Sequence, residues 1–163
     1  MHALALMVCR VHTFLFADLA GFTDFTDRHG DERAAALAVS FHEHVSLLAE
    51  EHGCEVVKTI GDAVMVRGEN CQAAVRLARQ IIERARQEGL PLVRVGLDTG
   101  PAVQCNGDWF GATVNIASRV TALTPAGELL MTERTRDACE GEPAERGCYR
   151  LKGLAGQRPL FAA

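Results

Sequence analysis

The chain has 163 residues, of which 48% are apolar and 23% are charged, and its formal net charge is −4 at pH 7. This length suits one domain with one substantial core, and the composition is typical of globular proteins. A general nucleic-acid binder normally carries a basic face, which this charge does not favour. The negative net charge does not exclude a locally positive pocket for a small molecule that carries phosphate.

Six cysteines are spread along the chain without a CxxC pair. Disulfide scaffolds are usually shorter and denser in cysteine, so we expect free thiols in a reducing cytosol. Residues 3–9 are apolar but too few to span a bilayer, and they lack the pattern of a secretory signal. We interpret them as a frayed or added strand in an N-terminal extension over residues 1–10, ahead of one domain over residues 11–163. The expected protein is cytoplasmic, without a membrane anchor of its own.

The first half of the chain alternates strand and helix patterns. Residues 11–18 are rich in β-branched and aromatic side chains and predict a buried strand. Apolar residues at helical spacing predict a long helix from about residue 31 to residue 52. Residues 54–60 and 63–67 then predict two strands joined by a Gly-Asp turn, which is a hairpin pattern.

The second half continues with a helix over residues 70–88, capped by Asn70, and a strand over residues 93–99. The remaining expected elements are a strand at 102–105, a helix at 114–123, a strand at 128–131, a short helix at 133–138, and strands at 149–151 and 159–161. The order β-α-β-β-α-β with an appended αβ portion is that of a ferredoxin-like α+β sandwich.

Two aspartates stand where strands end: Asp18 closes the first strand, and Asp62 occupies the hairpin turn. Each alone fits an ordinary turn residue. In a ferredoxin-like sheet, however, the first strand lies beside the hairpin, so the two carboxylates can meet. Carboxylate oxygens suit Mg²⁺ or Mn²⁺, and two such ions about 4 Å apart can activate an attacking oxygen and stabilise a leaving phosphate.

Other polar residues have two interpretations each. Lys58, in an apolar strand, either extends to solvent or needs a partner. Asn115 and Arg119 share one helix face, which is either solvated or able to hold a ribose and a charged transition state. Backbone N–H groups of residues 19–23 precede a helix start and could bind phosphate. The GxxxxGK[ST] pattern of a Walker-type ATPase is absent from the sequence.

Four segments, in order, together resemble the class III nucleotidyl cyclase catalytic domain. They are residues 16–23 (Phe-Ala-Asp-Leu-Ala-Gly-Phe-Thr), 58–63 (Lys-Thr-Ile-Gly-Asp-Ala), 94–100 (Arg-Val-Gly-Leu, then Thr-Gly) and 108–119. One such segment is a weak signal, but four in order over nearly the whole chain are very specific. The resemblance implies the class III cyclase fold and an adenylyl cyclase that converts ATP to 3′,5′-cyclic AMP and pyrophosphate.

The resemblance also implies roles for individual residues. Asp18 and Asp62 correspond to the carboxylates that bind two divalent metal ions, Mg²⁺ or Mn²⁺, together with the backbone carbonyl of Leu19. The expected phosphate contacts are Phe22 and Thr23 through backbone N–H groups, and Arg94 and Lys152 through side chains.

Lys58 and Asp108 resemble the pair that selects adenine. A lysine can donate to adenine N1 and an aspartate can accept from the 6-amino group, whereas guanine has the opposite polarity at both positions. Guanylyl cyclases of this family typically carry Glu and Cys, or similar residues, there. The resemblance further assigns ribose orientation to Asn115, and to Arg119 the stabilisation of charge on the α-phosphate.

Family members work as head-to-tail dimers, with the metal-binding aspartates from one subunit and the other site residues from its partner. A chain that carries both sets is therefore expected to form a homodimer with two equivalent sites. The alternatives are a guanylyl cyclase and a catalytically silent module that binds nucleotide or a partner.

Two features depart from the family pattern, and Trp109 has two interpretations of its own. Asp98 occupies a position where relatives often have His or Asn, and the hairpin over residues 100–108 is short. Residues 107–111 nevertheless resemble a compact bacterial variety. Trp109 is interpreted as loop packing near a dimer interface rather than as an aromatic anchor for a partner.

Overall fold

The structure, a computed structural model, describes residues 10–163. The extension predicted over residues 1–10, and the strand predicted within it, lie outside the described residues except for Arg10. No helix in the described part of the chain is long and apolar enough to cross a membrane.

A seven-stranded sheet in the order β2-β3-β1-β4-β7-β9-β8 forms the centre of the molecule. All neighbours are antiparallel except β4 and β7. Its strands are β1 (Val11–Leu19), β2 (Glu55–Ile60), β3 (Ala63–Gly68), β4 (Val93–Pro101), β7 (Leu129–Thr132), β8 (Ala144–Tyr149) and β9 (Arg158–Ala162). The first four strands in the order β2-β3-β1-β4 are those of a ferredoxin-like sandwich, and β7, β8 and β9 extend it, so the predicted α+β fold is confirmed.

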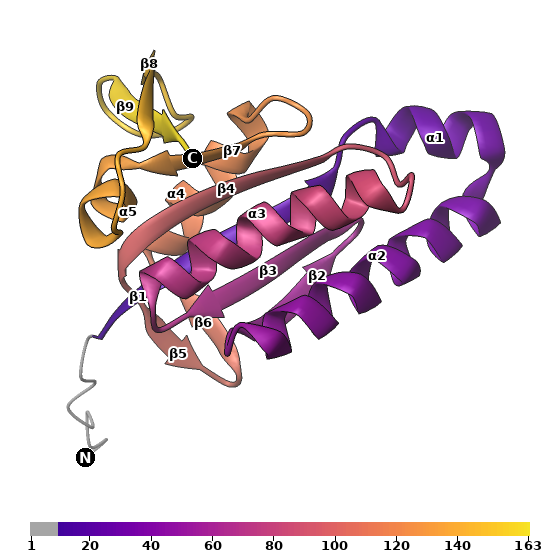
Figure 1. Ribbon diagram of the computed structural model, residues 1–163, viewed down its shortest axis with the longest axis horizontal. Coiled ribbons are helices and arrows are strands. Elements are labelled where there is room, and N and C mark those ends of the chain that lie inside the picture. The colour runs from indigo at the N-terminus through magenta and orange to yellow at the C-terminus, as the bar shows by residue number, and fades with distance from the viewer. Residues whose placement is uncertain (1–9) are drawn as a thin grey trace.

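The helices cover both faces of this sheet (Figure 1). They are α1 (Phe22–His29), α2 (Asp31–Glu51), α3 (Cys71–Gln87), α4 (Ala112–Leu123) and α5 (Glu133–Ala138). Helices α2 and α3 pack on one face, where they share the largest core cluster with the inward residues of β1, β3 and β4. Helix α4 packs on the opposite face beside a separate two-stranded hairpin, β5 (Val103–Cys105) and β6 (Asp108–Phe110).

Alternation along β1 decides which side chains reach each face. Leu15, Ala17 and Leu19 belong to the cluster under α2 and α3, whereas Phe14 and Phe16 belong to the cluster under α4 and β6. Successive side chains of a strand point to opposite faces, so Asp18 lies on the face that bears α4.

Helix α4 approaches the sheet closely because β4 has a glycine beneath it. A Cβ placed on Gly96 would lie 2.3 Å from the backbone nitrogen of Thr121 in α4. Thr121 also donates a hydrogen bond from Oγ1 to the carbonyl of Phe16 at 3.3 Å. The glycine therefore sets the height of α4 above the sheet.

Two local features concern the starts of helices. The segment after Gly21 is a separate helix, α1, because Gly21 adopts a left-handed conformation (φ 72°) and Gly30 (φ 86°) divides α1 from α2. The cap predicted at Asn70 is confirmed, since its side chain accepts a hydrogen bond from the Ala73 N–H at 3.0 Å.

The prediction that all cysteines are free thiols is wrong. Cys71, the first residue of α3, and Cys139, which follows α5, form a disulfide with Cα atoms 5.9 Å apart. The pairing arises because the start of α3 and the end of α5 meet at one end of the sheet. Among the described residues, Cys54, Cys105 and Cys148 are free.

Asp98, the residue that departs from the family pattern, lies fully buried in β4. It forms an ion pair with Arg134 of α5 and accepts a hydrogen bond from Thr132 Oγ1 at 2.5 Å. A buried carboxylate requires such partners. Asp98 therefore connects β4 to the start of α5 and has a structural role.

Candidate functional site

Asp18 and Asp62 come together at one end of β1. The β1–β3 pairing runs from Thr13↔Gly68 to Ala17↔Val64, which places the hairpin turn between β2 and β3 beside the end of β1. The backbone N–H of Leu19 donates to Asp62 Oδ2 at 3.0 Å. Asp62 therefore lies beside the residue that follows Asp18, and its charge acts on the Asp18 carboxyl.

Arg94 reaches the same cluster from β4. Asp18 and Arg94 are directly opposite each other in the β1–β4 pairing, and Arg94 Nε donates to Asp18 Oδ1 at 2.5 Å. Burial raises the pKa of Asp18 above its usual range, while Arg94 acts to lower it and the nearby Asp62 to raise it. A cation placed between the two carboxylates would instead lower the pKa of Asp18, because a nearby positive charge favours the ionised form.

The donor set fits a hard divalent ion. Two carboxylates and the neighbouring backbone carbonyl of Leu19 offer only oxygen ligands, which Mg²⁺ and Mn²⁺ prefer. Within residues 10–163, no group of three or more His, Cys, Asp or Glu side chains gathers in a metal-binding arrangement. An ion here would therefore take part of its shell from water or from substrate phosphates, as Mg²⁺ usually does.

Lys58 and Asp108 form a second cluster. Lys58 Nζ lies 2.7 Å from Asp108 Oδ2, and Asp108 Oδ1 accepts from the backbone N–H of Trp109 at 2.8 Å. The hydrogen bond from Lys58 is the main reason that the pKa of Asp108 lies below its ordinary value, so this carboxyl stays ionised. Both interpretations of Lys58 therefore apply, because its side chain is 41% exposed and also has Asp108 as a partner.

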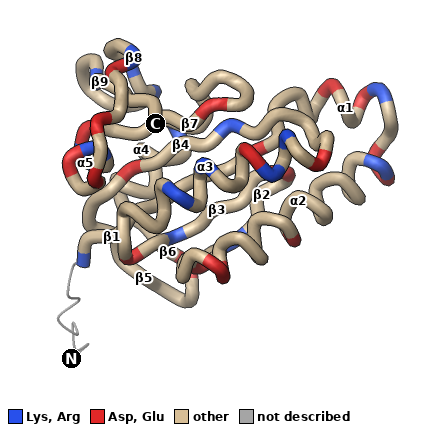
Figure 2. Tube along the Cα trace, viewed as in Figure 1, with Lys and Arg blue, Asp and Glu red and all other residues tan. Residues whose placement is uncertain are grey.

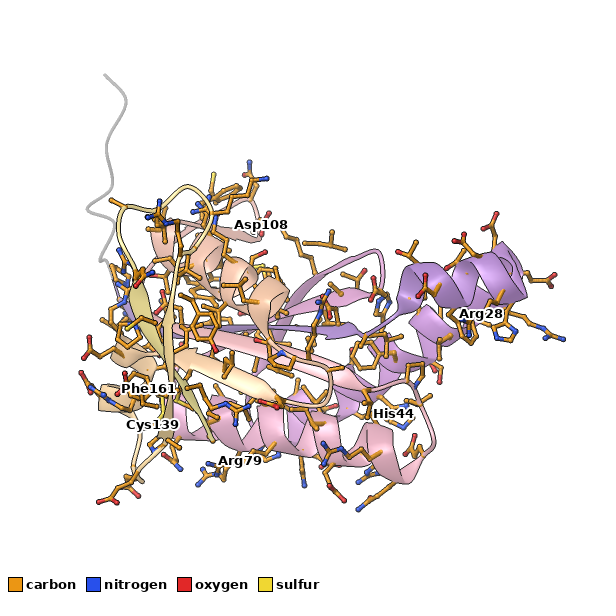
Figure 3. All side chains as sticks on the ribbon, turned by 90° about the horizontal axis from the view of Figure 1, so that it is seen from above. Arg28, His44, Arg79, Asp108, Cys139 and Phe161 are labelled. Atoms are coloured by element: carbon orange, nitrogen blue, oxygen red, sulfur yellow. A yellow bond between two sulfur atoms is a disulfide. The ribbon has the colours of Figure 1, made fainter. Side chains whose placement is uncertain are left out.

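A β-bulge turns Lys58 toward Asp108. Val56 of β2 pairs with Val66, but Lys58 pairs with Met65, so the register shifts between them. Met65 belongs to the cluster under α4 and β6, whereas Val66 belongs to the cluster under α2 and α3. Without the bulge, Lys58 would share the face of Val56. Figure 3 shows Asp108 on the α4 side of the sheet, with His44 and Arg79 on the opposite side.

The predicted phosphate contacts lie at the start of α1. Gly21 precedes the helix, and its carbonyl already accepts from the Phe25 N–H. The N–H groups of Phe22 and Thr23 fall in the first turn, where they have no acceptor within the helix. They are thus available to an anion.

Asn115 and Arg119 lie on α4, and Lys152 lies in the segment that follows β8. Asn115 is exposed on α4, and its helix neighbours Ile116 and Ala117 are buried. Arg119 lies against the segment that follows β8: a Cβ on Gly153 would come within 3.3 Å of its Nη2. Lys152, next to Gly153, is exposed.

The site residues fall into two sets within one chain. One set is Asp18, Leu19, Asp62 and Arg94; the other is Lys58, Asp108, Asn115, Arg119 and Lys152. Across residues 10–163, no hydrogen bond or ion pair joins a member of the first set to a member of the second. Both sets contain groups that can bind phosphate or purine, and no polar contact links them within the described part of the chain.

Three further residues near Asp108 were not singled out from the sequence. His12, Phe14 and Arg67 surround the ring of Trp109, which lies in the core of its own chain. The available signal was the alternation of β1, since His12 and Phe14 share one face. Arg67 carried no sequence signal of its own.

Known proteins resemble this chain in sequence and in fold. A family model described as the adenylate and guanylate cyclase catalytic domain matches residues 10–161. An adenylate cyclase of Streptomyces coelicolor is 36% identical over 152 residues, which cover 88% of this chain and 40% of that protein. The chain therefore spans about two fifths of the length of this curated relative.

Solved structures show the same fold. The adenylyl cyclase CyaB of P. aeruginosa has a TM-score of 0.80 and 22% identity, covering 94% of this chain and 93% of that one. The catalytic core of a rhodopsin-guanylyl cyclase with converted specificity, in complex with ATPαS, has a TM-score of 0.85 and 25% identity, with 94% and 95% covered. Similar cyclase domains are described as monomeric, from Trypanosoma brucei, and as dimeric, from Blastocladiella emersonii.

Proposed function

We propose, because the chain belongs to the adenylate and guanylate cyclase catalytic domain family, that it is an adenylyl cyclase domain that converts ATP to 3′,5′-cyclic AMP and pyrophosphate. The observation that carries the choice of substrate is the Lys58–Asp108 pair, with Nζ and Oδ2 2.7 Å apart. The charges also suit a small substrate: Figure 2 shows basic and acidic residues interspersed along the trace instead of gathered on one element.

The pair selects adenine by polarity. Lys58 donates to the unprotonated N1 of adenine, and Asp108, ionised because Lys58 holds its pKa low, accepts from the 6-amino group. Guanine would place an N–H against the ammonium and a carbonyl against the carboxylate. A site that leaves its polar groups unpaired discriminates strongly against the wrong ligand.

Asp18 and Asp62, with the Leu19 carbonyl, would hold two divalent ions, Mg²⁺ or Mn²⁺. When bound, these ions lower the pKa of the ribose 3′-hydroxyl and stabilise the departing pyrophosphate. The chain's own contribution at this end is the N–H groups of Phe22 and Thr23, which bind phosphate oxygens. Arg94, which pairs with Asp18 in this structure, would be the side chain at this end that contacts a phosphate.

The reaction is an in-line displacement at the α-phosphorus. The bond from the ribose 3′-oxygen to phosphorus forms, the hydroxyl proton passes to solvent water, and the bond to the pyrophosphate oxygen breaks. Asn115 orients the ribose, Arg119 stabilises the charge that develops on the α-phosphate, and Lys152 holds the β- and γ-phosphates. Positioning and electrostatic stabilisation supply most of the rate in such reactions.

A second copy of the chain completes each site. Within residues 10–163 no hydrogen bond or ion pair joins the two sets. A head-to-tail dimer would place the set with Asp18 and Asp62 from one copy against the set with Asn115 and Arg119 from the other. Such an arrangement gives two equivalent sites per homodimer.

The direct test is cyclic nucleotide formation by the purified chain, given ATP or GTP with Mn²⁺ or Mg²⁺. We expect cyclic AMP from ATP, and a loss of about 10³-fold or more in Asp18→Asn, because a metal ligand is removed. Asp27→Asn, an exposed change in α1, is the matched control and should keep wild-type activity.

Two outcomes would contradict the proposal. Cyclic GMP as the main product would make the chain a guanylyl cyclase. No product from a folded, dimeric protein would make it a silent nucleotide-binding module.

A further inference from the structure

The hairpin that carries Asp108 is not part of the main sheet. Strands β5 and β6 pair only with each other, in a sheet of two strands, while Lys58 lies in the seven-stranded sheet. Isolated two-stranded hairpins are marginally stable. The distance between Asp108 and Lys58 therefore depends on whatever fixes β6 against the sheet.

Trp109 provides that attachment. Trp109 as a residue is 8% exposed, and with its indole ring it belongs to the same core cluster as Phe14 of β1 and Met65 of β3. Its centroid lies 4.6 Å from the ring centroid of His12 and 5.9 Å from that of Phe14. Neighbouring residues of a strand point to opposite faces, so burial of Trp109 turns Asp108 away from the core and toward Lys58.

Arg67 covers the ring from β3. Its guanidinium carbon lies 4.7 Å from the Trp109 centroid, a cation–π distance. The side chain of Arg67 is only 15% exposed, and its Nε donates to Glu55 Oε2 at 2.7 Å. Arg67 Nη1 also donates to His12 Nδ1 at 3.0 Å. Arginine has no acceptor, so His12 must present a lone pair at Nδ1, and burial together with Arg67 lowers the pKa of His12, which favours that neutral form.

We propose that Trp109, held between His12 and Arg67, is the positioning residue for purine recognition: it fixes β6 so that Asp108 meets Lys58, and thereby sets the discrimination between ATP and GTP. This inference rests on the proposed adenylyl cyclase function. Its physical basis is that discrimination by paired polar groups requires fixed geometry, and a displacement of about 1 Å can cost on the order of 100-fold.

The test compares ATP with GTP in three variants. Trp109→Leu removes the stacked ring, Trp109→Phe keeps an aromatic ring, and Phe41→Leu is the control. Phe41 is a buried aromatic residue of α2 on the opposite face of the sheet, so its loss costs core packing without touching β6. The measured quantities are kcat and KM for each nucleotide.

Trp109→Leu should raise the KM for ATP about tenfold and lower the ATP-to-GTP ratio of kcat/KM about tenfold or more. Trp109→Phe should restore most of that ratio, and Phe41→Leu should keep it even if its unfolding midpoint falls. An unchanged ratio in folded Trp109→Leu, or an equal fall in Phe41→Leu, would overturn the inference.

If Trp109→Leu does not fold, a second variant tests whether the stack on Trp109 sets the ATP-to-GTP ratio. Arg67→Met keeps the aliphatic stem but removes the guanidinium over the ring, and it should lower the same ratio in the same direction. An unchanged ratio in Arg67→Met would then contradict the inference. A wild-type chain that makes no cyclic AMP, or prefers GTP, would instead refute the proposed function, so the two failures are distinguishable.

Fluorescence gives a readout that does not require turnover. Trp109 is the only tryptophan of the chain, so its emission reports this stack directly. Binding of a non-hydrolysable ATP analogue at Asp108 should change the emission of the wild-type protein and leave that of Lys58→Met unchanged. The GTP analogue should produce a much smaller change, and equal changes from both nucleotides would argue against the inference.

Discussion

At the residue scale, the burial of an aspartate and the partner it has distinguish a structural role from a role in ligand binding. Asp98 of β4 is fully buried and pairs with Arg134. Asp108 of β6 pairs with Lys58 and remains partly exposed to solvent. A buried carboxylate needs its partner for the fold, whereas an open one can exchange its partner for a ligand. This difference separates a structural aspartate from one proposed to bind substrate.

His12 gives the fold a predictable response to acid. Burial, followed by the charge of Arg67, lowers its pKa from the ordinary value of 6.5. The unfolded chain therefore takes up a proton more readily than the folded one, and the stability contributed by neutral His12 is complete above pH 6.5 and is lost as pH falls through the lower, folded pKa. The other charged groups that act on His12 are Arg10, Glu55 and Glu69.

We expect the free energy of unfolding to fall between pH 7 and pH 5, by at most about 1.4 kcal/mol per pH unit from this one group. His12→Gln, which can still accept from Arg67, should flatten the decline, and the exposed His29→Gln should not. Urea midpoints at each pH measure this. Parallel declines in wild type and His12→Gln would contradict the assignment.

At the scale of elements, the sequence predicted more of the fold than of its local irregularities. Helical spacing was sufficient for α2 and α3, and runs of β-branched and apolar residues were sufficient for the first four strands. The bulge that turns Lys58 could not be predicted, since nothing in the sequence of β2 distinguishes a shifted register from a regular one. The Cys71–Cys139 bond was missed because it depends on where α5 lies, not on cysteine spacing.

The carboxylate pair could be predicted because sheet topology alone brings Asp18 and Asp62 to one end of β1. The attachment of Asp108 through Trp109 could not, because it depends on side chains from β1 and β3 packing on a hairpin outside the sheet. Topology thus predicts neighbours along strands, and packing decides the contacts between layers.

Helix α4 supplies a test of positioning. A Cβ at position 96 would lie 2.3 Å from the Thr121 backbone nitrogen, so Gly96→Ala must push α4 away from the sheet. We expect a loss of stability of about 1–3 kcal/mol and a fall in kcat of about 10-fold or more, because Asn115 and Arg119 move with the helix. Wild-type kcat in a Gly96→Ala variant would show that the height of α4 is unimportant.

The disulfide makes a separate prediction. The bond closes a long loop, since Cys71 and Cys139 are 68 residues apart, and its reduction should lower the free energy of unfolding by about 2–4 kcal/mol. Urea unfolding with and without reductant measures this. In Cys71→Ser the reductant should have no further effect; a reductant effect that persists in this variant would assign it to other cysteines.

At the scale of the whole molecule, one chain carries both sets of site residues, and within residues 10–163 no hydrogen bond or ion pair joins one set to the other. Asp18 and Asp62 gather at the end of β1, and Arg119 lies beside the segment after β8. In the proposed head-to-tail dimer, a second copy of the chain supplies the residues that complete each site. Activity should then rise with protein concentration across the range in which dimers form.

The most direct measurement is cyclic AMP formation by a mixture of two inactive variants, Asp62→Ala and Arg119→Ala. Each alone lacks one half of every site. Random exchange makes half of the dimers mixed, and each mixed dimer has one intact site of two, so the mixture should recover about a quarter of wild-type activity. No cyclic AMP from the mixture, after subunit exchange has been demonstrated, would contradict an adenylyl cyclase site shared between two copies of this chain.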